Sequence, residues 1–391
     1  MKRKICFLTD SVFSIGGVQR VTAVVAKALS ADYDVSVVTF DPPSAKDTSL
    51  YGLYEVNIPY RFFAYPTVDR WKRLRCKVYS ALYRKLRLPW RWASDLYARS
   101  SFPAELRRAL AGELSRDAYD VIVGVHAPLA VRLASIQPLL PAGVTTIGWI
   151  HNSFEALYAH RSPYIGPELK RHYVLQLKKL HHTVVLCQHD AQCYHDYDPT
   201  FSPKVIYNPL TLRPGQLSDG RSRQFLAVGR FTPRHKGFDL LIRAFSIFAS
   251  HNSEWTLHIV GEGPEEPLYR QLISSNHLEQ RVVLHPFTIH IEQFYSRAQV
   301  YVLSSRWEGF GLVLVEAMAH GLPVVSSDLP TSREIMGESA SYFANGDVNQ
   351  LAERLLEATM IDWPMKSAEA LRLAHRFELN NIIGEWRQLL L

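Results

Sequence analysis

The sequence predicts an α/β protein built from two Rossmann-like, doubly wound domains. Its 391 residues exceed the length of one ordinary domain. Short β-branched runs alternate with amphipathic stretches from the start of the chain, which is typical of a parallel sheet covered by helices. The same pattern begins again after a polar stretch near the middle. Ligands of such folds bind beyond the carboxyl ends of the strands, so we expect the site in a cleft between two facing domains.

The first half begins as a β-α-β unit. Residues 5–8 form a short apolar run, and residues 35–40 form a second run that is rich in β-branched side chains. Between them, residues 18–29 have the period of a helix. Further strands are expected in this half at residues 121–125, 145–150, 183–186 and 204–207.

A polar break that includes Asn208, Pro209 and residues 213–223 separates the halves. Beyond it, strands are expected at 224–228, 255–260, 282–284, 299–303 and 324–326, and helices at 238–249, 268–276 and 312–320. We therefore expect an N-terminal domain over residues 1–210 and a C-terminal domain over residues 211–375. The last segment, 376–391, is expected to form a helix that packs back on the first domain.

The composition is that of a soluble globular protein, with 47% hydrophobic and 21% charged residues. No apolar run is long enough to cross a bilayer, and the chain enters a strand at once without a secretory signal, so a cytoplasmic location is expected. The four cysteines have no CxxC pair and no histidine partner at the spacing of a zinc site, which favours free thiols. They are Cys6, Cys76, Cys187 and Cys193.

Positive charge is concentrated in one segment. Residues 61–116 contain 14 Lys and Arg and four Asp and Glu, a net charge of +10, whereas the whole chain carries +7. One segment therefore supplies the basic character, and this asymmetry indicates a local anionic partner.

Two cations follow the first strand of the second half. Arg230 comes directly after Gly229, and Lys236 follows on the same short loop. Arginine offers a forked donor and lysine a point charge, so such a loop can hold a diphosphate. Two basic residues alone are also common on an ordinary solvated loop.

A glycine turn between two glutamates provides further evidence for a diphosphate site. Glu308 precedes the turn at Gly309–Leu312, and Glu316 lies in the helix that follows. The glycines let backbone N–H groups approach a ligand, and the start of the helix offers unpaired donors. Carboxylates accept hydrogen bonds from paired hydroxyls, so one glutamate would suit a sugar and the other a ribose.

These motifs resemble those of the retaining glycosyltransferases of the GT-B fold, specifically family four. Glu308 and Glu316 match the family's E-x7-E motif. The resemblance extends over the second half in family order, and in the first half it covers the glycine turn and the strand pattern. The segments that carry it are Gly16–Arg20, Gly229–Arg230, Lys236–Gly237, Gly261–Pro264 and Glu316–Val325.

The resemblance implies a role for each matching residue. Arg230 and Lys236 would bind the donor diphosphate, Glu308 would hold hydroxyls of the transferred sugar, and Glu316 would bind the ribose. His151, after the strand at 145–150, matches a family histidine that reaches the donor sugar; the alternative is a loop histidine without a role.

Further donor contacts are also implied. The backbone of Phe310, Gly311 and Leu312 would contact phosphate oxygens, as would Gly17 from across the cleft. Gly229 and Gly263 belong to the glycine loops of the donor site. Base recognition is expected near Phe287, from its location after a strand.

The implied reaction is retaining sugar transfer, without a metal, from a nucleotide sugar, with a UDP-sugar expected. Fixed cations aimed at the departing phosphate would stabilise it, and no Asp-x-Asp pair lies in a suitable loop to hold a divalent ion. A surface glycan, a lipopolysaccharide or a lipid-linked oligosaccharide is the expected acceptor. The alternatives are a non-catalytic nucleotide-sugar-binding protein and a same-fold epimerase or phosphorylase.

The basic segment also has the pattern of an amphipathic helix. Its apolar residues recur every three or four positions: Trp71, Leu74, Val78, Leu82 and Leu86. Cations surround this stripe, namely Lys72, Arg73, Arg75, Lys77, Arg84, Lys85 and Arg87, and Trp90 and Trp92 follow. Such a helix suggests that residues 67–100 contact an anionic membrane surface, with the protein at the inner face of the cell membrane. The alternatives are a helix packed on its own domain and a site for acceptor phosphates; no nucleic-acid motif accompanies the charge.

Overall fold

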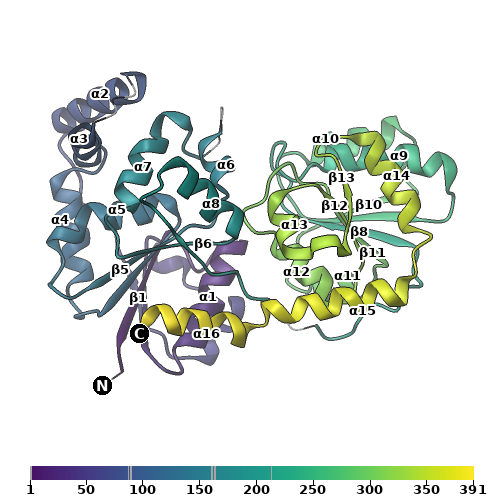
Figure 1. Ribbon diagram of the computed structural model, residues 1–391, viewed down its shortest axis with the longest axis horizontal. Coiled ribbons are helices and arrows are strands. Elements are labelled where there is room, and N and C mark those ends of the chain that lie inside the picture. Colours follow the sequence, from purple (N-terminus) through teal and green to yellow (C-terminus); the bar gives the residue numbers. More distant parts are fainter. Residues whose placement is uncertain (1, 87, 89, 160–161, 163, 213) are drawn as a thin grey trace. The chain divides into compact units, whose positions relative to one another are not determined.

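The computed structural model describes residues 2–86, 88, 90–159, 162, 164–212 and 214–391 (Figure 1). The chain forms two compact units, and each is described by itself. The first comprises Met1–Tyr207 and Ile382–Leu391, and the second comprises Asn208–Asn381. The sequence had suggested a division after residue 210, within a linker whose Arg213 lies outside the described residues.

The first unit contains a seven-stranded parallel sheet in the order β3-β2-β1-β4-β5-β6-β7. Its strands are β1 (Lys4–Thr9), β2 (Asp34–Thr39), β3 (Tyr60–Phe62), β4 (Val121–Val125), β5 (Thr145–Trp149), β6 (His182–Val185) and β7 (Lys204–Val205). The chain runs from β1 toward one edge and from β4 toward the other, so the order reverses between β1 and β4. In doubly wound folds this reversal marks the place where ligands bind.

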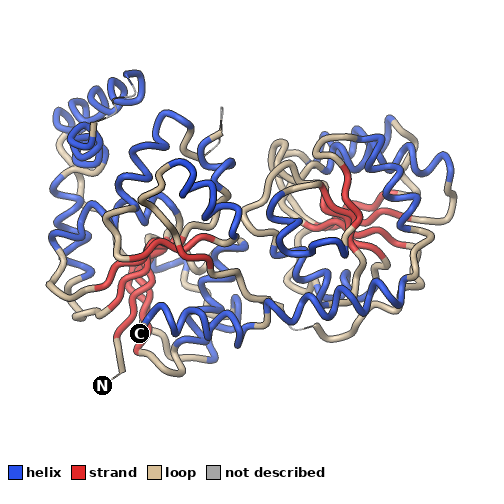
Figure 2. The backbone as a smooth tube through the Cα atoms, viewed as in Figure 1, coloured by secondary structure: helices blue, strands red, loops and turns tan. Residues whose placement is uncertain are grey.

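Helices cover both faces of this sheet (Figure 2). They are α1 (Gly17–Leu29), α2 (Arg70–Leu86), α3 (Arg91–Ser101), α4 (Ala104–Leu114), α5 (Ala127–Ile136), α6 (Phe154–Tyr158), α7 (Lys170–Leu177) and α8 (Gln188–Tyr197). The central strands are buried on both sides, which explains their nearly continuous apolar sequence.

The last helix, α16 (Leu379–Leu390), returns to the first unit (Figure 1). The Trp386 side chain is fully buried, and its ring lies 4.8 Å from the ring of Trp149 at the end of β5. Arg387 donates a hydrogen bond of 2.8 Å to Asp32. A short 3-10 turn at His375–Phe377, at the start of the predicted segment 376–391, precedes this helix.

The second unit contains a six-stranded parallel sheet in the order β10-β9-β8-β11-β12-β13. Its strands are β8 (Gln224–Val228), β9 (Thr256–Val260), β10 (Val282–His285), β11 (Val300–Leu303), β12 (Val324–Ser327) and β13 (Ser341–Phe343). The order reverses between β8 and β11. The helices are α9 (Phe238–His251), α10 (Glu266–Ser275), α11 (Glu292–Arg297), α12 (Leu312–Ala319), α13 (Pro330–Met336), α14 (Val348–Ala358) and α15 (Trp363–Ala374).

The predicted fold class is confirmed: both halves are doubly wound α/β units with parallel sheets. The predicted strands are present, with ends that differ by at most two residues. The edge strands β3 and β13 were not predicted, because each has only three residues and shows too little alternation to stand out from a loop.

Candidate active site

The loops that follow β8 and β11 lie at the switch point of the second sheet. These strands are neighbours, but the chain leaves them toward opposite edges. The loop after β8 begins at Gly229 and ends at Gly237, where α9 starts. The loop after β11 runs from Ser304 to Gly311, where α12 starts. The polar residues that the sequence singled out in this half are mostly on these two loops.

The two loops touch through a glycine. Gly237 has a φ of +63°, and a Cβ built there would lie 2.0 Å from the carbonyl oxygen of Ser304. The Ser304 hydroxyl donates a hydrogen bond of 2.8 Å to the carbonyl oxygen of Lys236. A side chain at position 237 would therefore force the loops apart, so glycine is required on both steric and conformational grounds.

Lys236 and Glu308 form an ion pair. Lys236 Nζ lies 2.7 Å from Glu308 Oε1, and the Ser305 hydroxyl donates a hydrogen bond of 2.6 Å to the same oxygen. The two side chains are only 14% and 7% exposed. Burial alone would raise the pKa of Glu308, but Lys236, His235 and Ser305 outweigh it and hold that pKa below its usual value. The carboxylate is therefore ionised at neutral pH.

Neighbouring residues that the sequence did not single out hold this pair in place. The rings of His235 and Trp307 stack 4.9 Å apart, and burial lowers the pKa of His235 to about 4, although Glu308 opposes that shift. Arg306 donates hydrogen bonds of 2.9 and 2.8 Å to the two carboxylate oxygens of Asp239. Arg306 and Trp307 stand directly before Glu308, but only the tertiary structure brings His235 and Asp239 to them.

Arg230 and Lys236 differ in their surroundings. Arg230 is the second residue after β8 and is exposed, whereas Lys236 is largely buried beside Glu308. A Cβ at Gly229 would lie 3.0 Å from the side chain of Lys236, so this glycine leaves room for the lysine stem. The first cation is therefore accessible, and the second is already paired with a carboxylate.

The turn before α12 opens the end of this helix. Gly311 has a φ of +83° and stands at the N-cap, and Leu312 is the first helical residue. The Phe310 side chain is buried, with its ring 5.7 Å from that of Phe377. The first N–H groups of a helix have no partner within it, so this turn can bind an anion.

Glu316 lies in the second turn of α12 and is 1% exposed. The Tyr295 hydroxyl donates a hydrogen bond of 2.9 Å to its Oε2, and the Tyr295 ring stacks on that of His320 at 5.0 Å. The Glu316 carboxylate is thus oriented by a tyrosine that lies in a different helix, α11. No spacing rule in the sequence linked Tyr295 to Glu316.

Gly263 and Phe287 follow β9 and β10, away from the switch point in the order of strands. A Cβ at Gly263 would lie 2.6 Å from the carbonyl oxygen of Phe231, because the loops after β8 and β9 pack closely. Phe287 is 37% exposed and follows the edge strand β10, which is two strands from β8. The structure therefore brings Gly263 next to the loop of Arg230, but it leaves Phe287 at the edge of the sheet.

In the first unit, Gly17 and His151 also follow strands. Gly17 is the first residue of α1, in the connection from β1 to β2. His151 follows β5 and is 6% exposed, with its ring 4.4 Å from that of Trp149 and 5.5 Å from that of His126. Among the described residues, neither ring nitrogen of His151 has a hydrogen-bond partner. Burial and the neighbouring His126 hold the pKa of His151 well below its usual value, so the imidazole is neutral.

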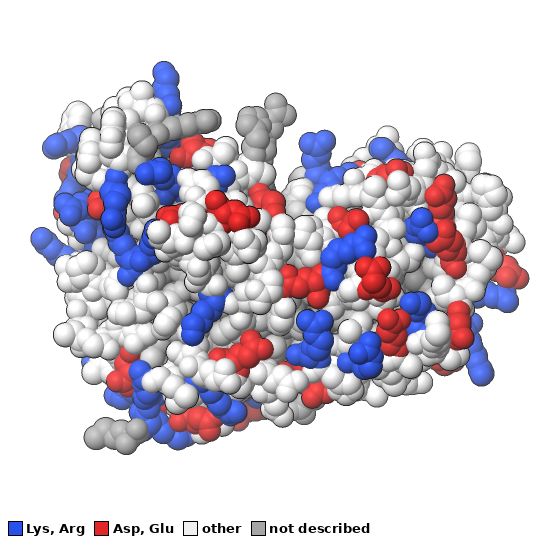
Figure 3. Space-filling model, in the orientation of Figure 1, with Lys and Arg blue, Asp and Glu red and all other residues white. Residues whose placement is uncertain are grey.

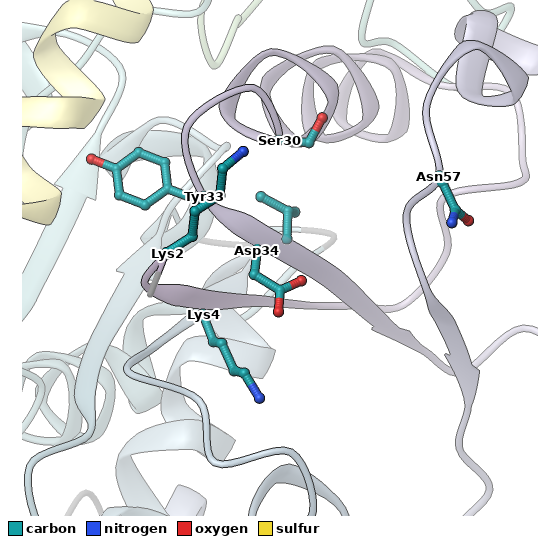
Figure 4. Close-up of a pocket in the computed structure, with 7 residues that line it drawn as sticks. Lys2, Lys4, Ser30, Tyr33, Asp34 and Asn57 are labelled. Atoms are coloured by element: carbon teal, nitrogen blue, oxygen red, sulfur yellow. The ribbon is translucent and has the colours of Figure 1, made fainter.

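A pocket at the opposite end of the strands of the first sheet contains none of these residues (Figure 4). It is lined by Lys2, Lys4, Ser30, Tyr33, Asp34, Val35 and Asn57. Lys4 and Asp34 are the first residues of β1 and β2, so this pocket lies at the amino ends of the strands. Ligands of doubly wound folds bind at the carboxyl ends of the strands, so we assign this pocket no role.

The basic segment forms α2 and α3, and the apolar stripe of α2 is exposed. Trp71 is 75% exposed, and Leu74, Val78, Leu82 and Leu86 are also exposed. The helix is held on the unit by its other face, where Tyr83 is buried and its ring stacks on that of Tyr97 at 4.6 Å. The apolar stripe itself takes no part in this packing, but the helix does pack on its own unit with its cations exposed, so the alternative of a helix packed on its own domain stays open.

Lys and Arg side chains gather over α2, α3 and α4 (blue in Figure 3). The exposed cations of α2 are Arg70, Lys72, Arg73, Arg75, Lys77, Arg84 and Lys85. Arg87 and Pro89 of the predicted membrane segment lie outside the described residues. In the part of the chain that is described, no helix is both long enough and apolar enough to cross a bilayer.

Comparisons with known proteins identify the class to which this fold and site belong. Residues 15–213 match the domain described as Glycosyltransferase Family 4, and residues 222–359 match the one described as Glycosyl transferases group 1. The chain belongs to glycosyltransferase family 4, a family of retaining enzymes with the GT-B fold. The resemblance noted in the sequence is thereby confirmed.

Similar proteins and structures cover the whole chain. An uncharacterised glycosyltransferase of Haemophilus influenzae is 26% identical over 99% of this chain and 100% of its own length. The apo form of the lipopolysaccharide outer core galactosyltransferase WaaB superposes with a TM-score of 0.68, 16% identity and 99% coverage of both chains. Anabaena HepE in complex with UDP-glucose gives a TM-score of 0.71, 20% identity and 99% coverage of both chains.

Proposed function

We propose that this glycosyltransferase moves a hexosyl group from a UDP-sugar to a surface glycan, a lipopolysaccharide or a lipid-linked oligosaccharide, without a metal ion. The second unit would bind the donor and the first unit the acceptor. The observation that carries the proposal is the buried ion pair of Lys236 and Glu308, at the same switch point as the open start of α12.

The donor diphosphate would lie between the cations and the helix start. Arg230 is exposed shortly after the end of β8, so it is accessible to an anion. Lys236 would be shared between the phosphate and Glu308. The N–H groups at Phe310, Gly311 and Leu312 would complete the phosphate contacts.

The two glutamates would orient the sugar and the ribose. Glu308 is ionised, and its Oε1 already accepts hydrogen bonds from two donors, so its other oxygen is suited to a sugar hydroxyl. Glu316 is held by Tyr295 and would accept a hydrogen bond from a ribose hydroxyl. Gly229 and Gly263 would keep the donor loops close together, and Phe287 would lie near the base.

The first unit would contribute Gly17 to the phosphate and His151 to the transferred sugar. A neutral, buried imidazole whose two nitrogens lack partners among the described residues costs free energy unless a ligand supplies one. A sugar hydroxyl is such a partner. His151 would then position the donor sugar by hydrogen bonding, with no need for protonation.

The reaction breaks the bond between the anomeric carbon and the diphosphate oxygen. Negative charge develops on the leaving phosphate, and Arg230, Lys236 and the start of α12 would stabilise it electrostatically. The acceptor hydroxyl would attack from the face that the phosphate leaves, and its proton would pass to the departing phosphate. This route retains the anomeric configuration and leaves Glu308 without a covalent role.

Two kinds of support favour this donor and acceptor. The HepE structure of the same fold contains UDP-glucose, and WaaB acts on the lipopolysaccharide outer core. The exposed stripe of α2, surrounded by cations, suits an anionic membrane surface and would bring the first unit to a lipid-linked acceptor. We therefore propose peripheral binding through residues 67–100 at the inner face of the membrane.

The proposal is tested by thermal stabilisation and transfer assays of the purified protein. A panel of UDP-, GDP- and ADP-sugars is compared, since a ligand that binds only the folded state raises its stability. A UDP-sugar is expected to give the largest shift, and chelation of divalent ions is expected to leave donor turnover unchanged. Replacing Glu308 by glutamine or Lys236 by alanine is expected to reduce turnover at least about 100-fold.

Matched controls come from surface ion pairs of the second unit. Glu357→Gln and Lys366→Ala each break a partly exposed pair between helical neighbours and are expected to retain wild-type turnover. A wild-type protein that binds none of the nucleotide sugars, or equal turnover in Glu308→Gln, would contradict the proposal.

A further inference from the structure

Three side chains of the types that can bind metals converge at the surface of the first unit. Glu155 is in α6, and His189 and Cys193 are one turn apart in α8. Cys193 Sγ lies 3.4 Å from His189 Nε2 and 3.6 Å from Glu155 Oε1, and His189 Nε2 lies 2.5 Å from Glu155 Oε1. We propose that this Glu-His-Cys cluster binds a Zn²⁺ ion.

The spacing of the three donor atoms is close to that of a tetrahedral zinc site. With ordinary zinc–ligand lengths, the sulfur–nitrogen and sulfur–oxygen edges of the tetrahedron are about 3.5 Å, and the nitrogen–oxygen edge is about 3.3 Å. The first two edges already agree with the structure. The third must open by about 0.8 Å, and a small rotation of Glu155 provides this because its side chain is 52% exposed.

The backbone beneath the cluster is held by independent contacts. Asp190 Oδ1 accepts a hydrogen bond of 2.8 Å from the backbone N–H of Phe154, which joins the start of α6 to α8. The rings of Phe154 and Tyr194 meet edge to face at 4.9 Å, and the Tyr158 and Tyr194 hydroxyls are 3.2 Å apart. The two helices are therefore fixed relative to each other, and the ligands need little reorganisation to close on an ion.

The donor set selects the metal. A thiolate and an imidazole favour Zn²⁺ over Ca²⁺ or Mg²⁺, which prefer oxygen ligands. Binding forms a zinc–sulfur bond and releases the thiol proton to the buffer, and a water molecule would fill the fourth position. The cluster contains none of the residues assigned to sugar transfer, so this inference does not depend on the proposed function.

The expectation that no cysteine has a histidine partner at the spacing of a zinc site overlooks Cys193, although Cys193 is a free cysteine as expected. His189 precedes it by one helical turn, which places both side chains on one face of α8. The third donor follows a different strand, β5, so spacing alone does not indicate a three-ligand site.

Cobalt titration of the reduced, full-length protein tests the site. Co²⁺ reports a cysteine ligand through a thiolate-to-metal absorption band in the near ultraviolet. We expect one equivalent of Co²⁺ to produce this band and Zn²⁺ to abolish it by displacement. Cys193→Ser and His189→Gln are expected to lack the band. The control variants are Cys76→Ser, in α2, and His195→Gln, on another face of α8, and both are expected to retain it.

Affinity and stability provide a second readout. Glu155→Gln is expected to weaken Zn²⁺ binding more than about tenfold, and Zn²⁺ is expected to raise the melting temperature of the wild type but not of Cys193→Ser. The absence of a cobalt band in the wild type would overturn the proposal. A band that persists in Cys193→Ser, or a zinc shift of equal size in that variant, would also overturn it.

Discussion

At the scale of single residues, the candidate site depends on a charge pair that is nearly out of water. Lys236 and Glu308 are 72 residues apart in sequence and lie on different loops. Their charged groups contact each other and are almost completely shielded from solvent. A buried pair is costly to break from one side, since the remaining charge stays desolvated. In the proposed reaction, the same pair would hold the lysine in place before the donor binds.

A double-mutant cycle on this pair measures its coupling. Lys236→Met is expected to lower the free energy of unfolding by about 3 kcal/mol, because Glu308 remains buried without its cation. Lys236→Met combined with Glu308→Gln is expected to cost less than the sum of the two single changes. Urea unfolding at neutral pH gives all four values, and strict additivity would show that the two side chains do not interact.

At the scale of elements, the helices α2 and α3 combine a charged surface with a small aromatic core. Tyr83 and Tyr97 pack with His172 of α7, whose ring lies 4.6 Å from that of Tyr97. Ser94 Oγ of α3 lies 2.9 Å from His172 Nδ1. One buried network thus attaches the basic helices to the unit, while the apolar stripe of α2 stays outside.

Acid is expected to weaken this attachment. Burial lowers the pKa of His172 to about 4 from its ordinary 6.5, with Lys179 acting in the same direction and Ser94 and Asp95 opposing. Between pH 6.5 and pH 4, His172 is protonated in the unfolded chain but stays neutral in the folded chain. The free energy of unfolding therefore falls as the pH decreases through this range. The full contribution is about 3 kcal/mol.

The measurement is urea unfolding at pH 7 and pH 5, for the wild type and His172→Gln. The wild type is expected to lose about 2 kcal/mol more than the variant over this interval. His195→Gln, which changes an exposed histidine, serves as the control and should follow the wild type. Equal losses in His172→Gln and the wild type would show that His172 is not held neutral.

Membrane binding is expected to depend on the stripe of α2. Replacing Trp71, Leu74 and Val78 by serine removes three exposed apolar side chains and no charge, and should weaken binding to anionic vesicles more than about tenfold. Sedimentation with vesicles of anionic and neutral lipid measures this effect. Changing the exposed Met360 and Met365 of the second unit to serine is the matched control and should change nothing. Equal vesicle binding by the stripe variant would contradict a membrane role for α2.

At the scale of the whole molecule, the chain forms most of the first unit, then the whole second unit, and ends in the first unit again. The last ten residues, from Ile382, complete the first unit, with Trp386 buried beside Trp149. The first unit therefore cannot finish folding until the entire chain is available. The 174 residues of the second unit, Asn208–Asn381, separate the two parts of its sequence.

Replacing Trp386 by alanine is expected to destabilise the first unit by about 3–5 kcal/mol. The second unit contains no part of this contact, so its unfolding transition without ligand should keep its temperature. Differential scanning calorimetry with and without the sugar nucleotide separates the two transitions. A uniform decrease of both transitions would show that the units unfold as one.

Much of the architecture was predictable because it is local. Apolar strands of four to six residues, helical periodicity and glycine turns specified both doubly wound units. The motif of Glu308 and Glu316 also indicated the family directly. The three-residue edge strands β3 and β13 were not predictable, since pairing with a neighbour, and not their own sequence, makes them strands.

The sequence alone determined which residue types follow each strand: Arg230 after β8, Glu308 after β11, His151 after β5. Only the tertiary structure decided their states. It buried Lys236 against Glu308, placed Tyr295 on Glu316, left the α2 stripe exposed, and joined Glu155 to His189 and Cys193. The physical reason is that charge, protonation and ligand geometry depend on distances across several ångströms between segments remote in sequence, which no local pattern specifies.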